Sequence, residues 1–379
     1  MKPSICILGS NLNRQDPRIF WRQGISLVNA GYEVTYVVSD NLPEETINAI
    51  KIIPTGFVTS GRVNRLLFSK NTFYKKAIEI NSDIYQISSP ELISVGLKLR
   101  KNNKKVIFDL REDYASFVLE MKWIPSMILR RFVLFAVKNY LNSALNKYNA
   151  VIGVTPLIFD NLKLTACPTF VITNFPIVRN ATETSAEEYL NRVDNLCYIG
   201  SVYPKSHQQK LFNILSDFKE LKYTIFGFIG ADLKNELSDL PYWSKVDYIN
   251  SFSKEKLYEV LDVATIGNAI LDYSPNLGYQ KGSLGVIKIF EYMEAAIPVI
   301  CTDFTLWKEI VEKYNCGICV HPQNEKEIQS ALEYLIENKM EAYQMGQNGR
   351  RAVLEEFNWN SQAVKYIHLI DEITKQEGS

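Results

Sequence analysis

The stretch Gly282–Asp303, GSLGVIKIFEYMEAAIPVICTD, constrains the fold most, because it predicts a loop, a helix, a turn and a strand in direct succession. Apolar residues recur at helical spacing over Val286–Ala296. Pro298 ends that helix, and the apolar run Val299–Cys301 is typical of a short buried strand. A helix followed directly by such a strand indicates an α/β domain.

The glycine-rich start of this helix predicts an anion site. Its first N–H groups lack partners within the helix, and the helix dipole places a partial positive charge there. Lys288 adds a cation in the first turn, and Glu291 can accept hydrogen bonds from vicinal hydroxyls such as those of a ribose. The arrangement suits a nucleotide diphosphate, but a plain helix with a solvated Lys and Glu explains the same residues. The candidate donor-binding residues here are Ser283, Leu284, Gly285, Val286, Lys288 and Glu291.

The run Lys288–Ile310, KIFEYMEAAIPVICTDFTLWKEI, resembles the donor-binding segment of GT-B glycosyltransferases, most closely glycosyltransferase family 4, or group 1. The resemblance implies that Glu291 holds the ribose of a nucleotide sugar and that the preceding loop amides hold its pyrophosphate. Many members carry a second Glu at the place of Ser283, and Ala296-Ile297 replaces the usual small residue and glycine before the proline. These departures leave the donor sugar unidentified.

Two features of the first half predict the other side of an active site. A strand at Ile5–Leu8 is followed by a glycine turn, and Asp16-Pro17 opens a helix that runs to about Asn29. With the strand Val34–Val38 this makes a βαβ unit, so the sheet is expected to be parallel. In the GT-B resemblance the turn faces a cleft and touches donor phosphate or acceptor, whereas a plain βα turn is the alternative. The turn residues are Gly9, Ser10 and Asn11.

The strand Lys105–Asp109 predicts the catalytic crevice, because polar residues follow its carboxyl end, where ligands of parallel sheets bind. The run VIFDLREDY resembles the family's D-x-H-E-D-Y/F segment. Arg111 stands where the family often has His, and Glu112 and Asp113 match. Arg111 cannot act as a base, but it can neutralise phosphate or orient a carboxylate. We expect these three residues to form the catalytic group.

A second α/β set begins at the strand Leu196–Ile199, and its loops predict further donor contacts. The family often has Gly-Ser after this strand and then a basic residue, for which Lys205 is preferred to Lys210. The candidate donor-binding residues of these loops are Gly200, Ser201, Lys205 and Gly227.

The chain of 379 residues predicts two domains, and its 46% apolar residues suffice for two cores. No apolar run reaches about 18 residues, so no transmembrane helix is expected. No signal peptide is recognised, which favours the cytoplasm. Cys316 and Cys319 form a lone CxxC, and the three histidines lack ligand spacing, so buried cysteines are expected, with no cofactor and no metal.

Charge is distributed unevenly. Residues 1–170 hold 22 Lys and Arg against 13 Asp and Glu, a net charge of +9 that residues 171–379 balance. Basic and apolar residues interleave in two segments, 62–76 and 123–138, as in segments that bind an anionic membrane surface. A solvated helix face explains the first segment, and core packing part of the second. No nucleic-acid motif accompanies the basic half, so nucleic acid is not an expected partner.

The predicted fold is α/β of the GT-B type, with two Rossmann-like domains whose parallel sheets face a cleft. Four segments are expected: an acceptor-binding domain (1–176), a linker (177–194), a nucleotide-sugar domain (195–358), and a C-terminal helix returning to the first domain (359–379).

The resemblance implies a metal-independent glycosyltransferase of the hexosyltransferase type, with a donor most often linked to UDP. The acceptor hydroxyl is expected on a glycan or lipid-linked sugar, in surface polysaccharide or glycolipid assembly, at the inner face of the plasma membrane. The sequence leaves the stereochemical outcome, the base, the sugar and the oligomeric state open. If the enzyme inverts, Glu112 or Asp113 is the expected general base. Two alternatives are a nucleotide-sugar 2-epimerase and a non-catalytic nucleotide-sugar-binding protein.

Overall fold

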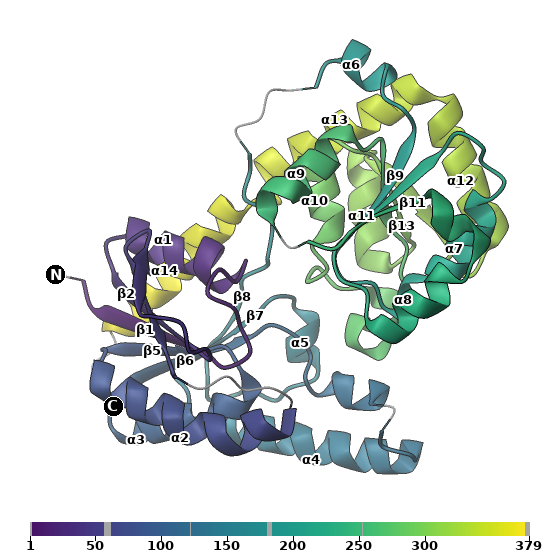
Figure 1. Cartoon of the computed structure of the whole chain (residues 1–379). Helices are drawn as coiled ribbons and strands as arrows, with labels where there is room; N and C mark the ends of the chain where they lie inside the picture. The colour runs from purple at the N-terminus through teal and green to yellow at the C-terminus, as the bar shows by residue number, and fades with distance from the viewer. Residues whose placement is uncertain (1, 57–61, 122, 180–183, 252, 376–379) are drawn as a thin grey trace. The chain divides into compact units, whose positions relative to one another are not determined.

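The computed structural model describes residues 2–56, 62–121, 123–179, 184–251 and 253–375, and the side chains of 62–68 lie outside this description. The chain divides into two compact units (Figure 1). Unit 1 comprises Met1–Asn174 and Trp359–Ser379, and unit 2 comprises Phe175–Asn358. Each unit is built on a parallel sheet with helices on its faces, which confirms the predicted fold class.

Unit 1 contains an eight-stranded sheet in the order β3-β4-β2-β1-β5-β6-β7-β8. All neighbouring pairs are parallel except β3 and β4 at the edge. Strand order reverses at β1, so the carboxyl ends of β1 and β5 lie at a topological switch point, where ligands of such sheets bind. The strands are β1 (Ser4–Gly9), β2 (Glu33–Val38), β3 (Glu45–Ile47), β4 (Ile50–Pro54), β5 (Ile84–Ile87), β6 (Lys105–Leu110), β7 (Ala150–Gly153) and β8 (Thr169–Val171).

Helices cover both faces of this sheet, with α2, α3 and α4 on one face and α1 and α14 on the other (Figure 1). The helix predicted to open at Asp16-Pro17 begins instead at Ile19, and Asp16 Oδ1 accepts the N–H groups of Arg18 and Ile19 at its start, at 3.0 and 2.9 Å. Its first turns form a π-helix. The helices are η1 (Ile19–Gly24), α1 (Ile25–Asn29), α2 (Arg62–Ile80), η2 (Pro90–Leu92), α3 (Ile93–Lys101), η3 (Ser116–Glu120), α4 (Met127–Leu145), α5 (Leu157–Asp160) and α14 (Trp359–Lys375).

Unit 2 contains a six-stranded sheet in the order β11-β10-β9-β12-β13-β14, and every neighbouring pair is parallel. The order reverses at β9. The strands are β9 (Asn195–Ile199), β10 (Lys222–Phe226), β11 (Val246–Ile249), β12 (Ile266–Ala269), β13 (Val299–Thr302) and β14 (Gly317–Val320). The α-helices are α6 (Ala186–Leu190), α7 (Gln208–Leu215), α8 (Ala231–Ser238), α9 (Lys254–Val263), α10 (Lys288–Glu294), α11 (Thr305–Tyr314), α12 (Glu325–Glu337) and α13 (Lys339–Glu355). The 3-10 helices are η4 (Pro204–Ser206), η5 (Pro241–Lys245), η6 (Pro275–Leu277) and η7 (Tyr279–Lys281).

Helix α10 is shorter than the predicted span of 286–296. Ala296 adopts a left-handed conformation, with φ of 57°, and this ends the helix before Pro298. The turn is packed closely: a Cβ added to Gly346 of α13 would lie 2.1 Å from Ala296 O. A side chain in the left-handed region costs roughly 1–2 kcal/mol, so the packing of α13 on α10 must offset that strain.

No helix in the described part of the chain is both long and apolar enough to cross a membrane.

Candidate functional site

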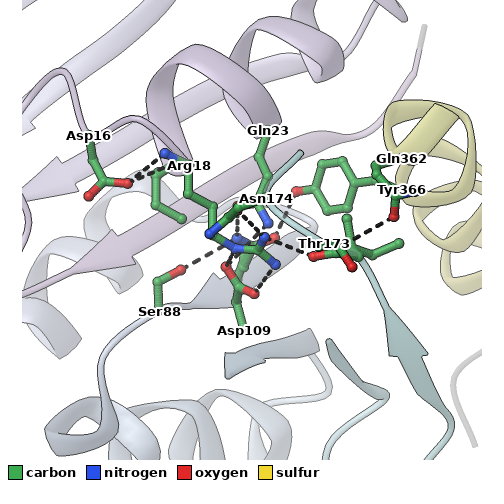
Figure 2. A network of polar contacts seen from close by, with 12 residues as sticks. Asp16, Arg18, Gln23, Ser88, Asp109, Thr173, Asn174, Gln362 and Tyr366 are labelled. Atoms are coloured by element: carbon green, nitrogen blue, oxygen red, sulfur yellow. Dashed lines mark hydrogen bonds and ion pairs between the residues drawn. The ribbon is translucent and has the colours of Figure 1, made fainter. Parts of the chain in front are cut away.

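Arg18 and Asp109 form a buried bidentate ion pair beneath the loop that follows β6 (Figure 2). Arg18 Nε lies 2.8 Å from Asp109 Oδ2, and Arg18 Nη2 lies 2.6 Å from Oδ1. The two residues are 1% and 0% exposed. A buried charge pair is stable only when further hydrogen bonds satisfy its remaining polar atoms.

Those further hydrogen bonds reach β5 and the C-terminal helix. Gln23 Nε2 donates to Asp109 Oδ2 at 3.2 Å, and Gln86 Nε2 donates to Gln23 Oε1 at 2.8 Å. Tyr366 of α14 donates its hydroxyl to Gln86 Oε1 at 2.7 Å (Figure 2). The network therefore ties η1, β5, β6 and α14 together inside unit 1.

The same arginine fixes the segment at which the chain leaves unit 1. Arg18 Nη1 donates to Ile172 O at 2.9 Å and to Asn174 Oδ1 at 2.5 Å. The N–H of Thr173 donates to Gln362 Oε1 of α14 at 3.1 Å. The end of β8 is thus held from both sides.

The predicted catalytic loop continues directly from this network. Arg111 Nη2 lies 3.1 Å from Asp16 Oδ2, the carboxylate that also caps η1. Burial lowers the pKa of Arg111, but the nearby carboxylates of Asp16 and Asp109 outweigh it, so the pKa lies above its ordinary value. Arg111 is therefore a permanently charged group at the carboxyl end of β6.

The two acids of this loop have different surroundings. Asp113 is buried: Oδ1 accepts the N–H of Ser116 at 3.0 Å, and Oδ2 accepts Asn161 Nδ2 at 2.7 Å. Both oxygens thus serve the start of η3. Glu112 is exposed. Of the two carboxylates, Glu112 is the one placed to meet a substrate.

The turn after β1 lies at the same edge of the sheet. Ser10 donates its N–H to Ser89 Oγ at 3.1 Å and its hydroxyl to Glu91 Oε1 at 2.8 Å. Ser89 and Glu91 follow β5, so the carboxyl ends of the two neighbouring strands are joined. Gly9 ends β1, and Asn11 is exposed. The structure thus gathers the predicted acceptor turn and the β6 loop on one edge of unit 1.

In unit 2, two glycines allow the loops after β9 and β10 to touch. Gly200 and Gly227 have φ values of +98° and +136°. A Cβ at Gly227 would lie 2.4 Å from Gly200 O, so no side chain fits there. Gly200 N–H donates to Phe226 O at 2.8 Å, and Ser201 follows half-buried. These backbones can approach a ligand closely.

The loop before α10 is fixed by its own contacts. Ser283 is buried, its Oγ accepts the N–H of Gly285 at 3.0 Å, and its carbonyl accepts Trp307 Nε1 at 3.0 Å. The amide of Gly285 is therefore engaged within the loop. Leu284 and Val286 are half-buried.

Lys288 is buried, so it is not the solvated lysine of the plain-helix alternative. Its Nζ lies 3.5 Å from the centroid of the Tyr198 ring, and among the described residues no acidic side chain pairs with it. Burial lowers the pKa of Lys288 to about 7. Tyr292, in the next turn, accepts the N–H of Ile199 at 3.0 Å and so holds α10 against the end of β9. Glu291 is half-buried in the same turn.

A polar cluster lies at the carboxyl edge of this sheet, and Lys205 is its one member that the sequence analysis named. Lys205 Nζ donates to Asn276 Oδ1 at 3.0 Å. His207 Nε2 lies 3.2 Å from Asp272 Oδ1, which also accepts Gln323 Nε2 at 2.7 Å. These residues come from the loops after β9, β12 and β14. Apart from Lys205, their only sequence signal is that each follows a predicted strand.

The cysteines are buried as expected, except that Cys319 is half-buried. Cys301 and Cys319 lie side by side on β13 and β14, with sulfurs 3.7 Å apart. The described residues contain no group of three or more His, Cys, Asp or Glu side chains that could hold a metal ion.

Comparisons with known proteins indicate the class of proteins to which this chain is similar. Residues 191–352 match the family model described as "Glycosyl transferases group 1". A segment of 130 residues, 34% of the chain, is 22% identical to a homoserine O-acetyltransferase of Clostridium botulinum. That match spans 42% of the relative's length.

Solved structures match the whole chain in fold. A sucrose-phosphate synthase from Thermosynechococcus elongatus has a TM-score of 0.74 at 17% identity, covering 98% of this chain and 99% of that one. An E. coli structure titled trehalose-6-phosphate, bound with UDP-2-fluoro glucose, has 0.70 at 12%, covering 99% and 100%. Anabaena HepE in complex with UDP and glucose has 0.70 at 12%, covering 98% and 100%. The chain has the GT-B fold. Residues 191–352, most of unit 2, are the part of the chain that is similar to the group 1 glycosyltransferases.

The Arg18–Asp109 pair predicts a large loss of stability when one partner is removed. We expect Arg18→Met to destabilise unit 1 by about 3–5 kcal/mol, because it leaves the Asp109 charge buried without its partner. Urea denaturation measures this change. Lys2→Met is the control, since its ion pair with Asp371 is exposed and is worth under about 1 kcal/mol. If both substitutions lowered the free energy of unfolding by the same small amount, the Arg18–Asp109 pair would not be the interaction that stabilises unit 1.

Proposed function

We propose that this glycosyltransferase moves a sugar from a UDP-linked donor to an acceptor hydroxyl. The observation that carries the proposal is the site at the start of α10, where a buried lysine without an acidic partner lies against Tyr198, two residues before Gly200 in the loop after β9. Several structures of the same fold have titles that name UDP or a UDP-sugar, which supports a UDP-linked donor here.

The donor diphosphate would lie between Lys288 and the backbones of Gly200, Ser201 and Gly227. A diphosphate supplies the negative charge that the buried ammonium lacks, so binding restores the charged form of Lys288. Glu291 would accept the ribose hydroxyls one turn later. Fixed cations and backbone N–H groups can offset the charge of a leaving diphosphate, which fits a metal-independent reaction.

The acceptor would bind at unit 1, with Arg111 and Glu112 as the catalytic group. Glu112 would take the proton of the acceptor hydroxyl if the reaction inverts the anomeric carbon. Arg111 would attract a phosphate on the donor or the acceptor. Asp113 would hold the loop in place by its contacts to Ser116 and Asn161.

The two acids therefore predict different mutant phenotypes. We expect Glu112→Gln to lower kcat for sugar transfer about 10²-fold or more, with unchanged UDP affinity and stability, because it removes only a proton acceptor. Asp113→Asn should instead lower stability by about 1–3 kcal/mol, because one capping contact is lost. Glu355→Gln, an exposed acid of α13, is the control.

Transfer assays and calorimetric UDP titrations of the three variants check this. A wild-type kcat in Glu112→Gln would refute the catalytic role. Epimerised donor formed without any acceptor would indicate a 2-epimerase instead.

We also propose that unit 1 docks on an anionic membrane surface, at the inner face of the plasma membrane, where the acceptor would be a lipid-linked sugar of polysaccharide or glycolipid assembly. The support is the first half of α4, where most large apolar side chains are exposed, while Leu141 and Leu145 in its second half are buried. Ile128, Phe132 and Phe135 share one helical face and are 81%, 69% and 64% exposed.

Charge favours a membrane as the occupant of this face. Arg131 lies exposed beside it, and residues 1–170 carry a net charge of +9. In the other predicted segment, 62–76, the side chains of 62–68 lie outside the described residues. Phe73, in the same segment, is buried in the core of unit 1 and is not available to a membrane.

The exposed apolar face of α4 predicts that its aromatic side chains contribute to membrane binding. We expect Phe132→Ser with Phe135→Ser to weaken binding to anionic vesicles at least tenfold, because each inserted ring contributes about 1.5–3 kcal/mol. Co-sedimentation at low salt measures this, and binding should fall at 1 M salt, where the Debye length is about 3 Å. Leu354→Ser with Val364→Ser removes exposed apolar residues elsewhere and is the control. Protein that stays in the supernatant at low salt would exclude this role of α4.

A further inference from the structure

A basic cavity of about 420 Å³ lies on unit 1, between α3 and Lys147, two positions after the end of α4. Four of its six lining residues are cationic, and none is acidic. The lining residues are Ser94, Leu97, Lys98, Arg100, Lys101 and Lys147. Its volume is within the range of small-ligand pockets, roughly 300–1,000 Å³.

The helical spacing of α3 creates this cluster. Ser94, Lys98 and Lys101 recur at intervals of four and three residues, so they share one face of the helix. Leu97 lies beside them. This face of α3 therefore combines an apolar wall, a hydroxyl and two ammonium groups.

Contacts within the protein fix one of the cations in place. Arg100 Nε donates to Lys147 O at 3.0 Å, and Arg100 Nη1 donates to Lys104 O at 3.3 Å. These bonds join the end of α3 to the segment after α4 and leave further guanidinium N–H groups for a ligand. The Lys98 ammonium lies 5.1 Å from the centroid of the Tyr74 ring. This cation–π contact holds the ammonium in position and leaves its charge uncompensated.

Electrostatics favours an anion in this cavity. The carbonyl groups at the end of α3 offset part of the positive charge. No ion pair between these cations and a described carboxylate offsets the rest. A phosphate can accept several charge-assisted hydrogen bonds from lysine and arginine together, which a carboxylate does less completely.

The cavity is separate from the proposed active site. Lys101 ends α3 just before β6 begins at Lys105, and Lys147 comes just before β7 begins at Ala150. The cavity therefore lies near the amino ends of these strands, whereas Arg111 follows the carboxyl end of β6. Six residues of strand span about 20 Å, so one phosphate cannot contact both places.

We propose that this cavity is a second anion site, which binds a phosphate-bearing ligand held by Lys98, Lys101, Lys147 and Arg100. The phosphate belongs either to a free phosphorylated small molecule or to the headgroup of an anionic phospholipid. The proposal does not depend on the donor site, because the cavity lies within unit 1.

The test is a calorimetric titration of inorganic pyrophosphate into the full chain at low salt. The pocket variant combines Lys98→Gln, Lys101→Gln and Lys147→Gln, which remove three charges and leave the bonds of Arg100 to backbone carbonyls intact. We expect at least a tenfold loss of pyrophosphate affinity in the pocket variant, and no loss in a control with Lys51→Gln, Lys326→Gln and Lys365→Gln. Circular dichroism confirms that both variants are folded.

Equal pyrophosphate affinity in wild type and pocket variant would overturn the proposal, as would an equal loss in both variants. Vesicles with and without phosphatidylserine separate the two sources of phosphate. A pocket variant that also loses vesicle binding identifies a lipid headgroup, and one that keeps vesicle binding identifies a free phosphorylated ligand. UDP affinity should be unchanged in the pocket variant. A failure of the proposed donor site can therefore be distinguished from a failure of the second anion site.

Discussion

The buried ion pair of Arg18 and Asp109 is the interaction on which unit 1 depends. Moving two charges out of water costs several kcal/mol for each ion, so the pair persists only because polar groups from distant segments complete its hydrogen bonds. Gln23 and Asn174 contact the pair directly, and Tyr366 is joined through Gln86. The C-terminal helix is therefore part of the core of unit 1.

This network also positions the predicted catalytic loop. Asp109 is two residues before Arg111, and Asp16 both caps η1 and pairs with Arg111. The position of Arg111 thus follows from the same contacts that stabilise the sheet.

The candidate site of unit 2 is built in a different way. Its candidate site depends on two glycines that bring loop backbones together and on a lysine whose burial lowers its pKa to about 7.

The fold could be predicted because its signals are local. Apolar strands alternating with helices indicate a parallel α/β sheet, and Asp16-Pro17 marks a helix start wherever it occurs. Burial of particular side chains could not be predicted in the same way. Phe73 and the exposed Phe132 both lie among basic and apolar residues in the sequence, and only packing against the sheet separates them.

The partners of polar residues were equally hidden. Asp113 and Glu112 are indistinguishable in the sequence, because Asn161, which binds Asp113, lies 48 positions further along the chain. The sequence did not identify Arg18 as part of a network, because its side-chain hydrogen-bond partners lie 91 or more positions away along the chain. The residues that the sequence proposed as the site lie at the carboxyl edges of their sheets, where the strand pattern places them. Their roles follow from contacts that only the folded chain creates.

The most direct test of this account is the proton balance of donor binding at Lys288. Calorimetric titration of UDP at pH 8, in buffers of different ionisation enthalpy, counts the protons taken up. Lys288 is largely neutral at that pH, so a diphosphate bound beside it should draw in close to one proton. The account predicts this uptake in the wild-type chain and its loss, with weaker binding, in Lys288→Met. UDP that binds both proteins with equal affinity and no proton uptake would contradict the donor site.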